Sequence, residues 1–158
     1  MSDNGCTNNR FAGSVKAAYV VGIGSERGTP LEVIGQGVMQ YLDQLDIDIQ
    51  DVLVASLEIK QYDPAYGRFA QVHDVPFVTC DAVTLSAVSG CSDPSIPWFD
   101  PKSISERSAL FFSGAQQLLA PSFSFRLCLG ERGVVVSVCK VLRAQVQDRE
   151  RSEPYLDF

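Results

Sequence analysis

The sequence is poor in the residues that build metal and redox sites. Its 158 residues include one histidine, His73, and five cysteines with no C-x-x-C pair among them. An odd number of widely spaced cysteines supports neither a zinc site nor a thioredoxin-like motif. Several of them lie in apolar segments, where a free cysteine packs as a small hydrophobic residue. We therefore expect no metal, no cofactor and a reducing, cytoplasmic location for a chain whose cysteines are Cys6, Cys80, Cys91, Cys128 and Cys139.

Long apolar runs and an excess of positive charge are also missing. No apolar run approaches the ~18 residues needed to cross a bilayer, and the polar N-terminus has no signal-peptide pattern. The net charge is −6, with 13 Lys and Arg against 19 Asp and Glu. Non-specific nucleic-acid binding requires a basic surface, so we expect neither a nucleic-acid nor a membrane partner. Any site for an anion must be locally basic or built from backbone N–H groups.

The length and the 46% hydrophobic content indicate one globular domain with a substantial core. Residues 1–14 are polar and read as a flexible leader. The folded domain is expected over residues 15–143, and residues 144–158 form a charged tail. We find no internal repeat and no second domain.

Apolar runs alternate with amphipathic segments along this domain. The apolar runs are continuous, which is typical of strands covered on both faces of a sheet. The pattern predicts an α/β fold: one three-layer domain with a mostly parallel sheet, helices on both faces and a C-terminal antiparallel hairpin. The expected strands are 17–24, 52–57, 75–79, 117–120 and a hairpin of 125–129 with 134–141. The expected helices are 31–45, 64–73, 81–88 and one from Ser103 or Ser105 to near Gly114.

The most informative segment runs from Gly22 to Glu32. Glycines lie at the end of a predicted strand and in the loop that follows it. Thr29 and Glu32 match a T-x-x-E capping box, and Pro30 fits the first helical position. A glycine-rich loop that enters a helix N-terminus presents N–H groups to an anion, and Arg27 adds a guanidinium fork. The loop is neither a P-loop nor G-x-G-x-x-G, and a junction without any ligand explains a G-x-G equally well.

The order of the motifs resembles the CobE / CbiG C-terminal family of cobalamin biosynthesis. The resemblance covers about residues 16–142, with Ser25 where relatives carry a cysteine and Ser122 where they often carry a lysine. The segments that carry it are Gly22-Ile23-Gly24 with Arg27-Gly28-Thr29, Ala55 to Lys60 with Asp63-Pro64, Val75 to Thr79, Pro94-Ser95, Ser103 to Leu110, Leu118 to Pro121, and residues 134–140.

The resemblance implies a role at the ring-contraction stage of corrin synthesis. It implies that the protein binds a carboxylate-rich precorrin and acts as a carrier or accessory factor. Other corrin-pathway enzymes are partners that the resemblance also allows. Fused relatives resemble hydrolases that open a ring lactone on a cobalt-precorrin, so a lactone hydrolase of the cobalt-precorrin-5A type is an alternative. Independently of the family, the glycine-rich loop allows a nucleotide-binding α/β domain.

The expected binding site lies at the carboxyl edge of the sheet, where open α/β sheets bind ligands. No catalytic residue is assigned. Two of the candidate residues also have a structural interpretation. Lys60 can be a solvated surface lysine, and Glu106 can be the partner of Ser103 in a capping box. His73 is expected to interact with a helix dipole, and Trp98 to anchor a proline-rich loop. The candidate ligand-binding residues are Gly22, Gly24, Ser25, Arg27, Gly28, Thr29, Lys60, Asp63, Ser95, Ser105 and Glu106.

Overall fold

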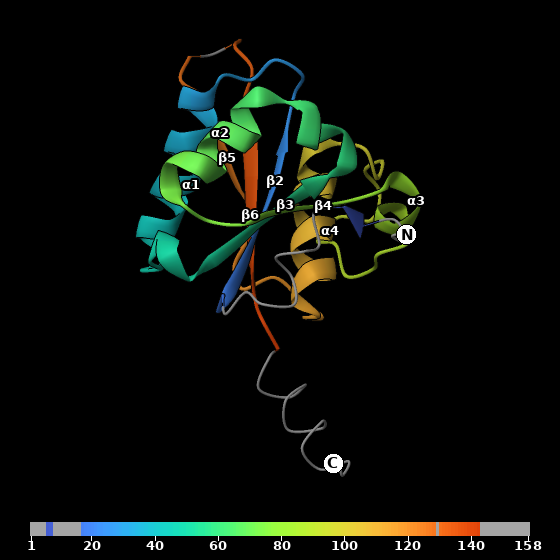
Figure 1. Cartoon of the computed structure of the whole chain (residues 1–158). Coiled ribbons are helices and arrows are strands. Elements are labelled where there is room, and N and C mark those ends of the chain that lie inside the picture. The colour runs from blue at the N-terminus through green and yellow to red at the C-terminus, as the bar shows by residue number, and fades with distance from the viewer. Residues whose placement is uncertain (1–5, 8–16, 129, 143–158) are drawn as a thin grey trace.

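The computed structural model describes residues 6–7, 17–128 and 130–142, which form one sheet flanked by helices (Figure 1). No helix in these ranges is long and apolar enough to cross a membrane. The strands are β1 (Cys6–Thr7), β2 (Tyr19–Ser25), β3 (Val52–Leu57), β4 (Phe77–Cys80), β5 (Phe123–Phe125) and β6 (Val134–Lys140). The α-helices are α1 (Leu31–Gln44), α2 (Pro64–His73), α3 (Ala82–Ser86) and α4 (Pro101–Ser113), with 3₁₀ turns η2 (Ile49–Asp51) and η3 (Glu58–Tyr62).

The sheet has the strand order β1-β4-β3-β2-β6-β5. The central strands β2, β3 and β4 are parallel, whereas β6 and β5 continue the sheet as antiparallel strands and β1 pairs antiparallel with β4. The predicted α/β class is therefore confirmed. Because β6 runs against β2, the loop that precedes β6 lies at the edge where β2 ends.

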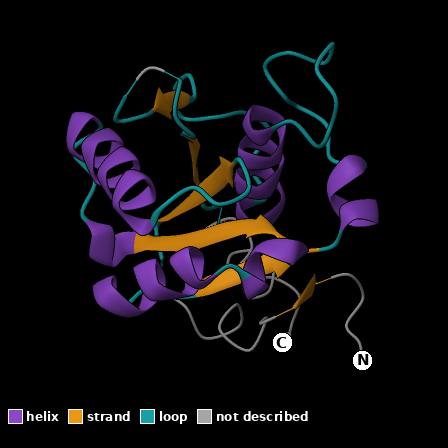
Figure 2. Ribbon diagram, turned by 90° about the horizontal axis from the view of Figure 1, so that it is seen from above, coloured by secondary structure: helices purple, strands orange, loops and turns teal. Residues whose placement is uncertain are grey.

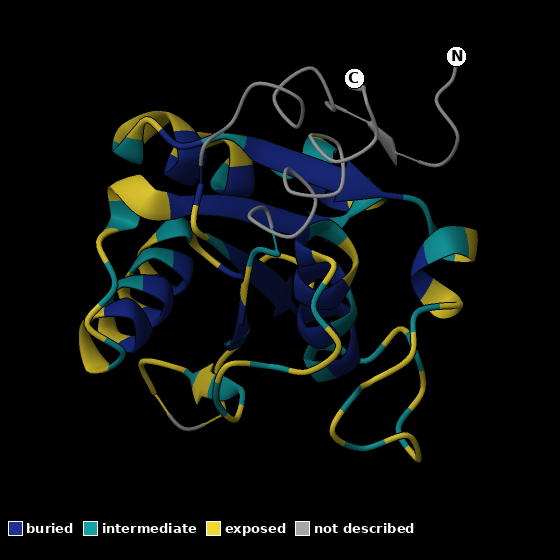
Figure 3. Ribbon diagram, turned by 90° about the horizontal axis from the view of Figure 1, so that it is seen from below, coloured by how far each residue is buried: buried dark blue, intermediate teal, exposed yellow. Residues whose placement is uncertain are grey.

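Helices cover both faces of the sheet, as Figure 2 shows. On one face, Val21, Ile23 and Val54 pack with the apolar sides of α1 and α2. On the other face, Val20 and Leu53 pack with residues of α4. Figure 3 shows the strands buried between these layers and exposed residues along the connecting loops. Since successive strand residues point to opposite faces, the continuous apolar runs follow from this three-layer arrangement.

The glycines of β2 have a packing role that the sequence interpretation did not include. A Cβ atom at Gly22 would lie 2.0 Å from the Ser105 carbonyl oxygen, and one at Gly24 would lie 1.9 Å from the Pro101 carbonyl oxygen. Both distances are far shorter than a non-bonded contact allows. The absence of side chains at these positions therefore lets α4 pack directly on the backbone of β2.

Several predicted boundaries were wrong. Residues 117–120 form no strand: the backbone N–H of Leu119 donates to Val138 (2.8 Å), and this contact does not extend into a ladder. Helix α4 begins at Pro101, because the Asp100 side chain accepts from the Lys102 N–H and so caps the helix earlier than the serines do. The hairpin is present, but its first strand ends at Phe125 instead of beginning there.

The two ends of the chain are described only in part. Within the predicted leader, Cys6 and Thr7 form β1 and pair with Cys80 and Thr79. The rest of the leader, residues 1–5 and 8–14, and the predicted tail 144–158 lie outside the described residues.

Candidate functional site

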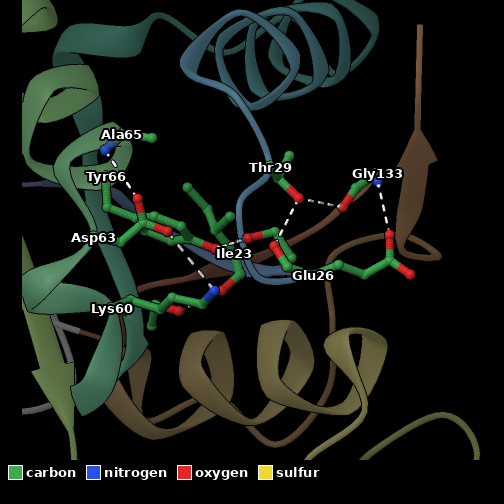
Figure 4. A network of polar contacts seen from close by, with 10 residues as sticks. Ile23, Glu26, Thr29, Lys60, Asp63, Ala65, Tyr66 and Gly133 are labelled. Carbon is green, nitrogen blue, oxygen red and sulfur yellow. Dashed lines mark hydrogen bonds and ion pairs between the residues drawn. The ribbon is translucent and has the colours of Figure 1, made fainter. Parts of the chain in front are cut away.

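Two loops that are far apart in the sequence join at the carboxyl edge of the sheet (Figure 4). The Glu26 carboxylate accepts a hydrogen bond from the Gly133 N–H (3.3 Å). The buried Thr29 hydroxyl donates to the Glu26 carbonyl (2.7 Å) and lies 3.4 Å from the Gly133 carbonyl. These contacts fix the loop between β2 and α1 against the loop between β5 and β6.

The predicted capping box is therefore not formed. The N-cap of α1 is Pro30, and no side chain accepts from the first turn of the helix. Thr29 is turned into the junction between the loops, because its hydroxyl satisfies the Glu26 carbonyl there. The N–H groups of this helix end remain without a side-chain cap, as an anion-binding helix terminus requires.

A pocket of about 730 Å³ opens between the two loops. Three arginines of its lining, Arg27, Arg126 and Arg132, have exposed side chains and are here called the arginine rim. The lining also holds two acidic residues, Glu26, which accepts from the Gly133 N–H, and Glu131. Because the three arginines outnumber them, the pocket has a net positive charge in a chain of net charge −6, as an anion site requires. Its lining residues are Glu26, Arg27, Gly28, Pro30, Arg126, Gly130, Glu131 and Arg132.

The sequence interpretation missed two members of the arginine rim. Arg126 donates to the Glu131 carbonyl across its own loop (2.5 Å), and the guanidinium of Arg132 lies over Gly28. Gly28 has a φ of +83°, a conformation that favours glycine. The antiparallel hairpin was the sequence signal that could have found both arginines. If β6 pairs antiparallel with β2, it begins beside the end of β2, and the loop that precedes β6 then lies next to Arg27.

A second, more buried group lies next to the arginine rim. The Ser25 and Tyr66 hydroxyls are hydrogen-bonded at 2.7 Å, and the Ser56 hydroxyl donates to the Ile23 carbonyl (2.6 Å). Burial raises the pKa of the Tyr66 hydroxyl far above its usual range, against the opposing effect of hydrogen bonds to Ser25 and Ser56. Tyr66 was not predicted as a site residue, because its spacing with Phe69 and Ala70 marks the apolar face of α2.

Lys60 is buried in this second group, so its interpretation as a solvated surface lysine was wrong. Only 8% of the residue is exposed, since η3 folds it against α2. Its Nζ atom lies 3.9 Å from Asp63 Oδ2 and 5.4 Å from the centroid of the Tyr66 ring (Figure 4). Burial lowers the pKa of Lys60, the Asp63 carboxylate opposes this shift, and the positive charge of Arg27 adds to it.

Asp63 has two roles at this position. Its Oδ1 atom accepts from the Ala65 N–H (3.0 Å) and caps α2, while Oδ2 faces Lys60. A carboxylate held by a helix cap has a fixed orientation. The carboxyl edge thus brings together Ser25, Arg27, Lys60 and Asp63 of the predicted set.

Among the predicted site residues, Arg27 and Gly28 alone line the pocket. Three of the others, Ser95, Ser105 and Glu106, belong neither to the pocket lining nor to the contacts around Lys60. Ser95 is exposed, and its hydroxyl and N–H both donate to Asp93, which makes a local turn. Ser105 and Glu106 are buried inside α4, at 0% and 1% exposure. The helix starts at Pro101, two residues earlier than the first predicted start, so both residues lie within the helix and face the protein interior.

Glu106 is not the capping partner of Ser103, whose hydroxyl instead accepts from Arg107 (2.8 Å). The Glu106 carboxylate accepts from the Ser92 N–H (2.7 Å), the Ser92 hydroxyl (2.8 Å) and the Ser122 hydroxyl (2.7 Å). A chain of hydroxyl contacts then continues to Ser137 and Ser105. This serine–glutamate network, made of Ser92, Ser105, Glu106, Ser122 and Ser137, ties two loops to the α4 face of the sheet.

His73 and Trp98 both lie away from the pocket lining. His73 lies in the last turn of α2, with its ring 4.6 Å from that of Phe69. Among the described residues no group of three metal-binding side chains is present. Trp98 packs against a small cluster with Leu85 and Ile104, and so anchors its loop.

The chain matches the family model described as Cobalamin synthesis G C-terminus over residues 19–139. It belongs to this family. The match includes the loop between β2 and α1, the Lys60 group and all three members of the arginine rim. No curated protein sequence matches the chain at a comparable level.

Solved structures of cobalamin biosynthesis proteins share the fold. CobE, a protein from the cobalamin (vitamin B12) biosynthetic pathway, is 17% identical with a TM-score of 0.61, over 81% of this chain and 93% of CobE. The cobalamin biosynthesis protein ChiG from Agrobacterium tumefaciens is 22% identical (TM-score 0.55; 78% and 98% covered). A cobalamin biosynthesis protein G homologue from Sulfolobus solfataricus is 20% identical (TM-score 0.56), with 77% of this chain matching 37% of that protein. These likenesses show a shared fold, and membership of the family rests on the match over residues 19–139.

Proposed function

We propose that this protein binds a carboxylate-rich precorrin at the ring-contraction stage of cobalamin biosynthesis and acts as a carrier or accessory factor. The arginine rim is the observation that carries the proposal. It concentrates three guanidinium groups around one pocket of an acidic protein. Guanidinium forks match the geometry of carboxylates, and the periphery of a precorrin carries many of them.

The size and position of the pocket support this function. Its volume of about 730 Å³ lies in the range of ligand sites, ~300–1,000 Å³. It opens at the carboxyl edge of the parallel strands, where α/β sheets bind ligands. The contacts of Glu26 and Thr29 with Gly133 hold both loops in place, so the rim is organised before a ligand arrives. A pre-organised site loses less conformational entropy on binding.

The same geometry gives less support to the lactone hydrolase. A hydrolase needs a base or nucleophile that is active near neutral pH. The hydrogen-bond partner of Ser25 is Tyr66, and because burial raises the pKa of Tyr66, its hydroxyl stays protonated and cannot remove a proton from Ser25. The single histidine lies in the last turn of α2, whereas Ser25 contacts the first turns of that helix through Tyr66.

Titration by visible absorption tests the proposed function. Cobyrinic acid and its fully esterified form share one macrocycle but differ in carboxylate charge, so the acid is expected to bind and the ester to bind more weakly.

Two controls test the alternative functions. ATP, NAD and S-adenosylmethionine serve as nucleotide controls, and binding of these without a corrinoid response would identify a nucleotide-binding domain. With a lactone-bearing precorrin, we expect retention through gel filtration without aldehyde release; catalytic aldehyde release would identify the hydrolase instead.

A further inference from the structure

Lys60 combines features that are unusual for a lysine at a protein edge. Its side chain is 11% exposed, and that of Asp63 beside it is 20% exposed, so both keep limited contact with solvent at the carboxyl edge. Neither belongs to the lining of the arginine pocket. A lysine that only attracts carboxylates binds them best when it is fully charged and its side chain extends into solvent. Lys60 is instead folded against the face of the Tyr66 ring.

The surroundings of Lys60 favour the neutral amine. Burial is the largest influence, and it lowers the pKa of Lys60 because a buried ammonium loses hydration. Asp63 opposes the shift, and the positive charge of Arg27 reinforces it. Desolvation together with a neighbouring cation is one of the arrangements that activates lysine as a nucleophile toward carbonyl compounds.

We propose that the Lys60 amine forms a covalent imine with an aldehyde or ketone that reaches the carboxyl edge of the sheet. Its lone pair attacks the carbonyl carbon and forms a C–N bond as the C=O π bond breaks, and one proton passes from nitrogen to the carbonyl oxygen to give a carbinolamine. Nitrogen then releases its second proton, which the departing hydroxyl takes up, so that the C–O bond breaks and water and the imine result. Asp63 Oδ2, 3.9 Å from Nζ, is the group that accepts each proton from nitrogen and passes it to the oxygen.

Asp63 is positioned for this proton transfer by its cap. Because Oδ1 is held by the Ala65 N–H at 3.0 Å, the carboxylate cannot rotate freely, and Oδ2 stays on the side of the amine. Tyr66 closes the other side: its ring lies 5.4 Å from Nζ, and its hydroxyl is held by Ser25. The ring excludes bulk water from one face of the amine, which slows hydrolysis of the imine.

Reductive trapping tests the proposal on the full-length protein. Propionaldehyde with cyanoborohydride at pH 7 converts an imine to a stable secondary amine, which peptide mapping by mass spectrometry locates. We expect Lys60 to be modified faster than the exposed Lys140, since a lowered pKa raises the neutral fraction of an amine at a given pH. Modification of Lys60 at the rate of Lys140, or more slowly, overturns the proposal.

Variants and pH separate reactivity from a structural role. Arg27→Ala removes a positive neighbour, so the pH profile of trapping at Lys60 should move to higher pH, whereas the exposed Arg68→Ala on α2 should leave it in place. Lys60→Arg should abolish the adduct in the 58–62 segment. If that variant does not fold, two measurements still test the proposal. One is the ratio of the modification rates at Lys60 and Lys140 in the wild-type protein, and the other is the pH profile of trapping in the Arg27→Ala variant.

The proposal is independent of corrin binding, because the probe is a small aldehyde. Normal corrinoid titration without selective trapping at Lys60 overturns the imine alone. Selective trapping without corrinoid binding overturns the proposed function alone.

Discussion

The arginine rim and the serine–glutamate network are both rich in polar groups, yet their organisation differs. In the network, the Glu106 carboxylate accepts three hydrogen bonds from protein groups and is 1% exposed. In the rim, the guanidinium groups are exposed and point into a pocket, with much of their hydrogen-bonding capacity left for a ligand. The comparison teaches that a polar group satisfied by the protein supports the fold, whereas an exposed, convergent set supports binding.

The largest effect should come from the strand that supports both regions. Gly24→Ala places a Cβ atom 1.9 Å from the Pro101 carbonyl, so α4 must shift, and we expect a loss of about 3 kcal/mol or more in unfolding free energy. Urea denaturation measures it. Gly67→Ala on α2 is the matched control, because its Cβ meets nothing within 4 Å and removal of a helical glycine should stabilise the protein. Equal stability of the two variants would contradict close packing of α4 on β2.

Removing the Glu106 carboxylate from the serine–glutamate network should lower the unfolding free energy somewhat less than the glycine substitution does. Glu106→Ala leaves the Ser92 N–H and the hydroxyls of Ser92 and Ser122 without their shared partner, so we expect a loss of about 3 kcal/mol in unfolding free energy. Glu131→Ala, at an exposed site, should change stability by less than about 0.5 kcal/mol. If Glu106→Ala instead weakens corrinoid binding and leaves urea unfolding unchanged, the network belongs to the binding site.

Cysteine reactivity offers a comparison without mutation. Burial raises the pKa of the Cys139 thiol to about 11, and Cys139 lies on the α4 side of β6, whereas Cys128 is exposed in the loop of the arginine rim. At pH 8 we expect iodoacetamide to modify Cys128 at least about a hundredfold faster, because the thiolate is the reactive form and Cys139 remains a thiol. The rate at Cys139 should rise as the pH approaches 11, and mass spectrometry of peptides follows both sites. Comparable rates at pH 8 would show that the α4 face opens readily.

The smallest effect is expected at the rim itself. Arg132→Ala should lower affinity for cobyrinic acid about tenfold, toward the low end for a charge-assisted contact because the side chain is exposed. Unfolding free energy should hardly change. Arg68→Ala serves as the control for a lost exposed arginine outside the pocket. A fall in stability with unchanged affinity would assign Arg132 a structural role and remove the main support for the proposed function.

Some site features followed from local sequence and others did not. Helix α2 was predicted at its observed bounds, 64–73, because Pro64 and the spacing of its apolar residues are local signals. The capping box at Thr29 was predicted from an equally local pattern but failed, since the hydroxyl donates to the Glu26 carbonyl (2.7 Å) at the junction with Gly133, 104 residues away. A local capping signal fails where other backbone groups compete for the same side chain.

The sequence by itself determined the α/β class, the central strands, the loop that carries Arg27 and membership of the family, because these depend on periodicity and on the order of short motifs. Only the tertiary structure decided which polar residues meet. Pairing of β6 with β2 brings Arg126 and Arg132 to Arg27, α2 covers Lys60, and close packing on Gly22 and Gly24 buries Ser105 and Glu106. Burial and electrostatic surroundings arise from contacts between distant segments, and these contacts set whether a charged group faces solvent, a ligand or the protein interior.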